Sequence, residues 1–481
     1  MGTVTSVGSG NWATGGTWDS GSRAGNSDDV VIASGHNVTI SQGEQANSLT
    51  VASGGTLTAS GERTITIDSE NGSGFAVDID GAISGDVNLT ITTPATTSVD
   101  MTASSGKVHD LIINHASCVV NAETTVDITG DLTITAGTFN TNNNVLTVAG
   151  DVSVTGTLTG NESAISMNSL TIESAGTYSA TNQTTTLSGE KDYWCLDVKD
   201  GGTFTHNNGM VLVTTNTNTI IRGMEGDDTA GAGANALNRL QVELGGSSYR
   251  LELDPVSGTS HTIKGNVTIA EGSFYPDDHA HTLTIEGDVS IESGGTLGHA
   301  DRTGADTFGS LTIASGGTAI ATSGTTTITG ETASHAWKND ESDGTGFVHN
   351  NGLVHFDYIG DATSGSINVK ENVFYDLEIS LYATTYSCSL YDGDGSNAVT
   401  ILNNLDVTKG EVEFSTASDT ITIHGLTNIT ANAKFSDNAS HDTNKIIHNG
   451  LVTNLGTYNI NDGTTVKLNG GIRQLGTLTV K

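Results

Sequence analysis

The segment GDLTITAGTFNTNNNVLTVAGDVSV (130–154) shows the pattern from which the fold class of this chain can be predicted. It holds short runs in which apolar residues alternate with small polar ones, and Gly or Asn stands between the runs. A period of two predicts strands that bury one face, and Gly and Asn favour the turns between them. The same design returns in GNVTIAEGSFYPDDHAHTLTIEGDVSI (265–291) and NNLDVTKGEVEFSTASDTITIHGLTNI (403–429). Short strands that return at a short interval predict a solenoid.

The composition points to the same class of fold. Among 481 residues there are 61 Gly and only 3 Pro, and charged residues make up 15% of the chain. Ordinary globular domains carry about 25% charged residues. Val, Ile and Thr occur throughout in alternating runs, and no helical period is visible. We therefore predict an all-β, single-stranded parallel β-helix, which the usual handedness of parallel crossovers makes right-handed.

The short repeats are grouped into a longer sequence repeat. Three segments begin alike, namely HDLIINHASCVV (109–120), NRLQVELGGSSYRL (238–251) and YDLEISLYATTYSCSL (375–390). The body is predicted to be three tandem large repeats at 109–237, 238–374 and 375–481, of which the third is shortened. Residues 1–108 are predicted to form an N-terminal cap and the first coils, because a solenoid must cover its first coil or expose a sheet edge.

Two further pairs of segments match between the first and second repeats. SLTIESAGTYSATNQTTTLSGE (169–190) matches SLTIASGGTAIATSGTTTITGE (310–331), and each is followed by a tryptophan, Trp194 or Trp337. The motif HNNG recurs at 206–209 and 349–352, and IIHNGLV (446–452) is a shortened third copy. Asn-Gly favours a tight turn with positive φ, so His206 and His349 are predicted to be corner or stacking residues.

The net charge and the absence of targeting signals disfavour some classes of partner. The formal net charge is −36, so nucleic acid and anionic membranes are improbable partners because both attract clusters of Lys and Arg. No apolar run approaches the length of a membrane helix, and the N-terminus does not have the pattern of a signal peptide. Cys118, Cys195 and Cys388 are odd in number, widely spaced and set in apolar runs, so we predict buried free thiols.

The opening of the chain resembles a known group of proteins. NWATGGTW (11–18) followed by SDDVVIASGHNVTI (27–40) looks like the start of bacterial and phage surface β-helix proteins, including the haemagglutinin-like and eight-glycine modules. The body repeats look like those of large bacterial surface adhesins and of fibre or appendage proteins of tailed phages. The chain departs from the autotransporter pattern, since neither a signal peptide nor a C-terminal membrane barrel is recognised. This departure favours the virion interpretation.

Three motifs are candidates for metal or glycan binding. DGDGSN (392–397) offers Asp392, Asp394 and Ser396 as the first half of a calcium loop, although Asn403 stands where a closing Glu is needed. A plain turn is the alternative. PDDHAH (276–281) offers carboxylates and imidazoles that suit a metal, with a solvated loop as the alternative. Trp194 and Trp337 would suit stacking on sugars if exposed, with packing in the core as the alternative.

The function expected from these patterns is structural. No motif of paired acids with a nearby His or Arg suggests a glycosidase or lyase, so we predict that the chain is not an enzyme and needs no cofactor, with Ca²⁺ as one option. The leading hypothesis is a bacteriophage fibre, spike or capsid-attached appendage at the virion surface. Its expected partners are other virion proteins, further copies of itself, for instance as a trimer, and host surface glycans. A bacterial cell-surface adhesin, which would be extracellular, and a tailspike-like polysaccharide depolymerase are the alternatives.

Overall fold

The protein is all β, and successive strands lie in parallel coils. The computed structural model describes residues 2–224, 235–254, 260–276, 278–330, 335–341, 345–358, 364–368, 372–391, 398–414, 420–437, 445–461 and 463–480. Contacts between Cα atoms divide the chain into two compact units, Met1–Asn238 and Arg239–Lys481. The only helix among the described residues is one 3₁₀ turn, η1 (Gly15–Thr17). The predicted β-solenoid is therefore confirmed, and the division falls one residue after the predicted start of the second repeat.

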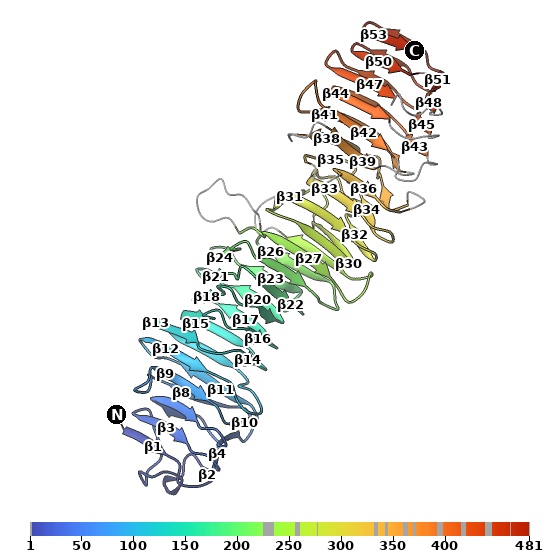
Figure 1. Cartoon of the computed structure of the whole chain (residues 1–481). Coiled ribbons are helices and arrows are strands. Elements are labelled where there is room, and N and C mark those ends of the chain that lie inside the picture. The colour runs from blue at the N-terminus through green and yellow to red at the C-terminus, as the bar shows by residue number, and fades with distance from the viewer. Residues whose placement is uncertain are drawn as a thin grey trace. The chain divides into compact units, whose positions relative to one another are not determined.

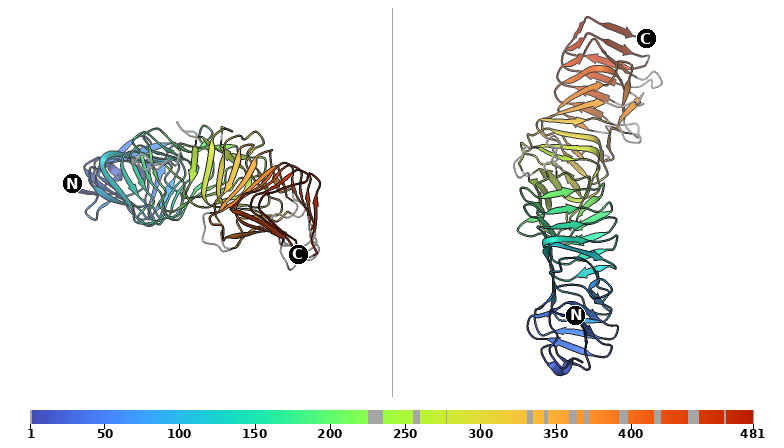
Figure 2. Two further views of the ribbon diagram at one scale, coloured as in Figure 1. Left: turned by 90° about the horizontal axis from the view of Figure 1, so that it is seen from above. Right: turned by 90° about the vertical axis from the view of Figure 1, so that its left-hand side faces the viewer.

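Most coils of the first unit have three sides, with one short strand on each side (Figure 1). The longer strands β13 (Leu111–Ala122) and β15 (Leu132–Asn140) each run along two sides and pair with two strands of a neighbouring coil. Strands of one coil pair in parallel with the strands of the next, so that β3 pairs with β6, β4 with β7 and β5 with β8. Figure 2 shows these strands, coloured blue, stacked coil upon coil. The two coils consist of β3 (Asp28–Ile32), β4 (Asn37–Ile40) and β5 (Glu44–Ala46), then β6 (Ser48–Val51), β7 (Thr56–Ala59) and β8 (Arg63–Ile67).

The second unit has the same three-sided plan and also contains long strands that turn a corner without breaking. The long strand β31 pairs with β29 and β30 on one side and with β33 on the other, and β30 also pairs with β32. The strands of this region are β29 (Ser260–Ile263), β30 (Val267–Pro276), β31 (Thr282–Ile291), β32 (Gly295–Leu297) and β33 (Asp306–Ile313). Corresponding corners of neighbouring coils therefore lie one above the other.

The core is a set of aliphatic ladders. Leu132 and Ile134 on β15 (Leu132–Asn140) lie in register with Val152 and Val154 on β17 (Asp151–Val154), and all four are at most 1% exposed. Strands in a sheet are about 4.8 Å apart, so equivalent methyl groups of successive coils are in contact. The residues between them alternate to the outside, which is the pattern of period two that the sequence predicts. Stacking therefore buries side chains that a single coil would leave exposed.

The recurring Gly-Asp pairs have a structural cause at one corner of the coil. Asp110 Oδ1 accepts a hydrogen bond from the backbone N–H of Asp131 at 2.8 Å, and Asp131 Oδ1 accepts one from Asp151 at 2.8 Å. A Cβ atom on Gly130 would lie 2.1 Å from Asp110 Oδ1, so only glycine leaves room for the carboxylate of the preceding coil. Several acids of this chain thus bind backbone groups of the next coil.

The N-terminal tryptophans close the first coil, and the three cysteines lie in the core. Trp12 and Trp18 are at most 2% exposed and pack edge to face, with ring centroids 5.1 Å apart. The Trp18 indole N–H donates to the backbone oxygen of Trp12 at 2.8 Å. The cysteines are free and buried, as predicted, and burial raises their pKa values to about 11 or 12, which suppresses the thiolate: Cys118, Cys195 and Cys388.

The HNNG motifs form the predicted turns with positive φ. The left-handed residues are the two asparagines, Asn207 (φ 46°) and Asn208 (φ 62°) in the first unit and Asn350 (φ 45°) and Asn351 (φ 58°) in the second. In both turns the histidine Nδ1 accepts a hydrogen bond of 2.9 Å from the second asparagine N–H. The two histidines are therefore corner residues that fix the turn.

The third copy of this motif is different. His448 ends β48 (Lys445–His448), points into the core and is fully buried. Its Nδ1 lies 2.8 Å from Thr427 Oγ1 and its Nε2 lies 3.0 Å from the hydroxyl of Tyr458. Because HNG lacks one asparagine, its histidine lies inside the strand and not at the corner.

Candidate binding sites

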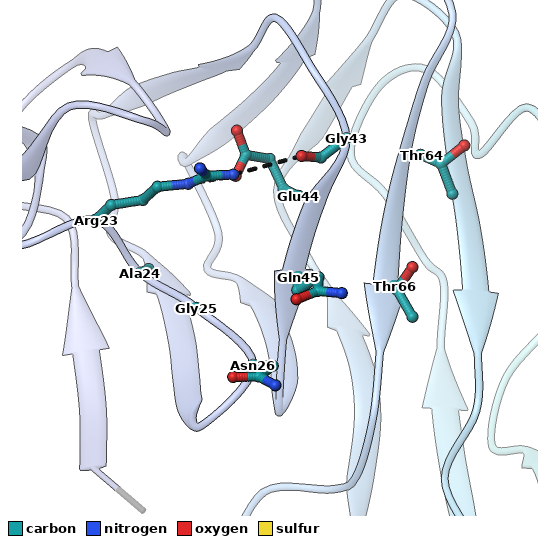
Figure 3. A pocket seen from close by; sticks show the side chains of 9 residues that line it. All are labelled: Arg23, Ala24, Gly25, Asn26, Gly43, Glu44, Gln45, Thr64 and Thr66. Carbon is teal, nitrogen blue, oxygen red and sulfur yellow. Dashed lines mark hydrogen bonds and ion pairs between the residues drawn. The ribbon is translucent and has the colours of Figure 1, made fainter.

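A polar hollow of about 600 Å³ lies beside the first complete coil of the first unit (Figure 3). One wall is the loop at 23–26, and the other is formed by strands β5 and β8. All of this region lies in the part that was predicted to be a cap. The residues that line the hollow are Arg23, Ala24, Gly25, Asn26, Gly43, Glu44, Gln45, Thr64 and Thr66.

An ion pair forms the inner end of this hollow. Glu44 occupies an inward position of β5, where the burial pattern is buried, exposed, buried, and its side chain has no exposed surface. Arg23 closes over it, with Nη2 2.5 Å and Nε 3.0 Å from Glu44 Oε2. Desolvation raises the pKa of Glu44, and the charge and hydrogen bonds of Arg23 oppose that rise. Glu44 Oε1 is buried without a hydrogen-bond partner, so the carboxylate retains one free acceptor.

The rim of the hollow carries neutral hydrogen-bonding groups. Gln45 is exposed and lies in register with Thr66 on the next coil, and Asn26 faces them from the loop (Figure 3). Amides, hydroxyls and an ion-paired carboxylate suit a ligand rich in hydroxyl groups. Glycoside hydrolysis ordinarily needs two carboxyl groups across the bond that is cut, and Glu44 is the only carboxylate among the lining residues. This hollow is therefore suited to binding and not to that chemistry.

Trp194 is partly exposed, and a cation covers its ring. The indole lies at the start of β23 (Trp194–Val198), and the Arg222 guanidinium is 4.0 Å from the ring centroid. Arg222 is held there by Asp197, which accepts from its Nε at 2.7 Å and from its Nη2 at 2.9 Å. One face of the indole is thus occupied by a cation–π contact. Lys199 Nζ also lies 5.1 Å from the ring centroid, and stacking of a sugar on Trp194 remains a prediction.

Trp337 corrects the prediction that the two tryptophans share one position and one role. It is fully buried against Phe347 and Phe356, so its ring offers no face to a sugar. Trp337 lies in register with Leu311, whereas the residue in register with the equivalent Leu170 is Leu196 and not Trp194. The sequence spacing is misleading because the loop before HNNG is two residues longer in the second unit.

The predicted metal ligands have different outcomes. Asp392, Asp394 and Ser396 lie outside the described residues, as does Asp277 of PDDHAH. In the described part of that motif, His281 Nε2 lies 3.7 Å from Asp278 Oδ2. His279 is apart from this pair and stacks on His299, whose ring centroid is 4.7 Å away. His299 could not be recognised from the sequence as a neighbour of His279, because it lies on the corner of the next coil.

Three carboxylates, Asp78, Asp80 and Asp100, also lie close together on the first unit. Asp78 and Asp100 are direct partners in neighbouring strands. Desolvation raises the pKa of Asp78, and the charges of Asp80 and Asp100 raise it further. Asp100 Oδ1 accepts hydrogen bonds from the hydroxyl groups of Thr102 and Thr124, so this carboxylate oxygen already has partners within the protein.

The fold and these sites define a protein of the parallel β-solenoid class. No family model, curated protein or solved structure that was compared with the chain matches it. Among the residues that the structure describes, no helix is long and apolar enough to span a membrane.

Proposed function

We propose that this chain is a non-catalytic structural protein, a fibre, spike or capsid-attached appendage of a bacteriophage that presents a surface to host glycans. One observation carries the proposal: in each unit the coils stack in parallel and in register, so that most of the large apolar residues are buried in the core. What remains for a partner is the outer surface of the coils, which is rich in Thr, Asn and Asp. Fibres, adhesins and tailspikes all use such a fold, and the resemblance of the opening sequence supports a virion protein.

The hollow at Arg23 and Glu44 is the glycan contact that we propose. Gln45 and Thr66 can donate to and accept from sugar hydroxyls at the rim of the hollow, and the buried Glu44 holds Arg23 beside them. Attachment of this kind needs many weak contacts, and repeated copies of the chain in an assembly strengthen it by avidity. Further copies of the chain and other virion proteins are the proposed partners.

Two experiments test this function. Mass spectrometry of purified particles of the phage that encodes the chain should detect it as a component, and its absence from them would contradict the virion assignment. An array of bacterial surface polysaccharides should retain the full chain. Replacing the exposed rim residue Gln45 with Ala should weaken retention, whereas Gln183→Ala, an exposed glutamine on another coil, should not. Release of reducing ends from the retained polysaccharide would indicate a depolymerase.

A further inference from the structure

Two corners of the second unit bring histidines from different coils together. His279 lies in the corner between β30 and β31, and His299 and Asp301 lie in the corner between β32 and β33. The backbone oxygen of His279 accepts hydrogen bonds from the N–H groups of Thr303 at 2.8 Å and Gly304 at 2.9 Å. The second corner is thereby tied to the first, so the proximity of the side chains follows from the backbone pairing.

The side chains at these corners form a compact, open cluster. The His279 and His299 rings are 4.7 Å apart and inclined by 22°, which matches the spacing of successive coils. Tyr275 packs against these rings. It is 6% exposed, and its ring centroid is 5.1 Å from that of His299. One ligand atom from each of His279, His299 and Asp301 lies within 4.8 Å of the others. The Asp301 side chain is 75% exposed, so the cluster is open to solvent.

We propose that His279, His299 and Asp301 bind a divalent transition-metal ion, with Zn²⁺ as the best match. Two imidazoles and one carboxylate are a common set of zinc ligands, and water completes the tetrahedron. Zn–N bonds of about 2.0–2.1 Å place two tetrahedral ligands roughly 3.4 Å apart. The ligand atoms must therefore approach one another by about 1.5 Å or less, which rotation of partly exposed side chains provides. Ca²⁺ and Mg²⁺ are poor candidates because they prefer oxygen ligands.

Neighbouring charges favour a cation at this corner. Asp278 lies beside His281, and Arg302, the basic residue that follows Asp301, is buried and paired with Asp306. The corresponding turn of the first repeat, TNNNV (141–145), carries Asn142 and Asn143 with positive φ and has no ligand of this type. The proposed site is therefore a feature of the second unit and not of the solenoid in general.

Calorimetric titration of the full chain with ZnCl₂, after removal of bound metal with EDTA, tests the proposal. Wild-type protein should bind one Zn²⁺ at this corner, and His279→Ala and His299→Ala should each weaken binding by at least about tenfold. His424→Ala removes an exposed histidine elsewhere in the same unit and should have no effect. Zn²⁺ binding that is absent in the wild type, unchanged by His299→Ala, or weakened equally by His424→Ala would overturn the proposal.

A second measurement needs no variant. Co²⁺ added to the wild-type chain should give the visible absorption bands of a tetrahedral site, and Zn²⁺ but not Ca²⁺ should abolish them. Octahedral bands alone would contradict the tetrahedral site, and bands that Ca²⁺ removes as readily as Zn²⁺ would contradict a site built on the histidines.

Discussion

The coil that begins at Ser169 in the first unit and the coil that begins at Ser310 in the second have similar sequences but differently filled cores. In the first, Tyr178 fills the interior, and its hydroxyl lies 2.8 Å from Thr185 Oγ1. In the second, the position of Tyr178 is taken by Ala319 and that of Thr185 by Thr326. Thr185 and Thr326 lie at equivalent positions of the parallel strands. The two coils therefore share one backbone arrangement and differ in the side chains that fill their cores.

Larger residues elsewhere compensate for the missing tyrosine. Trp337 takes the place of Leu196, and the buried Asp306, paired with the 1% exposed Arg302, takes the place of Ile165. A cavity of about 10 Å³ remains between Ala319, Asp306 and Trp337. A solenoid coil therefore tolerates redistribution of side-chain volume, and even a buried ion pair, when the ladder of backbone hydrogen bonds is kept.

The largest expected effect comes from breaking the buried ion pair. Arg302→Met leaves Asp306 without its partner and should destabilise the second unit by about 3–5 kcal/mol at neutral pH. Burial raises the pKa of Asp306 to about 6 although Arg302 lowers it, so the variant should have a still higher pKa, and this loss should diminish as the pH falls toward 6 and the variant's carboxyl becomes neutral. Urea unfolding followed by hydrogen exchange of β33 measures both effects. The double variant Arg302→Met, Asp306→Ile imports the isoleucine of the first unit and should recover the stability.

The second effect depends on pH and on His448. Burial lowers the pKa of this histidine from 6.5 to about 4. The unfolded chain then takes up a proton near pH 6.5 and the folded chain only near pH 4, so stability present above pH 6.5 is lost as the pH falls between these values. The loss should reach about 3 kcal/mol. No histidine is buried in the described part of the first unit, which should not respond in this way.

His448→Gln is the matched variant for this measurement. Asp306 has the opposite pH dependence, so the quantity to measure is the stability difference between wild type and His448→Gln at pH 7 and at pH 4.5. The difference should narrow at the lower pH, because only the wild type loses stability through this histidine. A difference that is the same at both values would rule out the proposed titration.

The third effect tests the exchange of volume between Tyr178 and Trp337. Trp337→Leu restores the leucine of the first unit but not its tyrosine, and should cost about 2–3 kcal/mol through the enlarged cavity. Adding Ala319→Tyr should recover part of this loss, and Ala319→Tyr alone should destabilise by overpacking. Hydrogen exchange of the strands around Ala319 follows all three variants. Additive effects of the two substitutions would refute compensation.

The smallest effect distinguishes the two threonines. Thr185→Val removes the hydrogen bond to Tyr178 and should cost about 1 kcal/mol. Thr326 Oγ1 is buried without a hydrogen-bond partner, so Thr326→Val should be neutral or stabilising by up to about 1 kcal/mol. Unfolding curves of the two variants, recorded side by side, provide the measurement. Equal destabilisation by both substitutions would mean that the coils are filled alike.

Much of the fold could be predicted because every coil requires the same alternation of apolar inward and polar outward residues. Leu132 and Ile134 face the core of one coil as Val152 and Val154 face that of the next, so the period of two is visible over the whole chain. The buried free cysteines and the left-handed turns of HNNG are local properties of the same pattern. The repeat also reveals the Gly-Asp pairs, although their role as corner ligands of the backbone becomes visible only in the structure.

The candidate binding sites were less predictable, because their residues come from different coils and meet only through the way in which the corners of those coils stack. His279 contacts His299, twenty residues later, and not its sequence neighbour His281, because the loops of successive coils overlap there. Trp337 was misplaced because SLTI recurs after 310 − 169 = 141 residues, whereas HNNG recurs after 349 − 206 = 143 residues. Glu44 was missed because an acid at an inward position can be recognised only once the register of β5 is known.

The two HNNG turns also bear on how the protein ages. Asparagine followed by glycine is prone to spontaneous deamidation, since the glycine nitrogen attacks the asparagine side-chain carbonyl and ammonia leaves. At Asn208 and Asn351 that nitrogen is engaged, because Gly209 N–H donates to His206 O at 2.8 Å and Gly352 N–H donates to His349 O at 3.0 Å. The geometry that closes each corner therefore protects its most labile amide, and we expect these sites to outlast the same tetrapeptide in an unfolded chain.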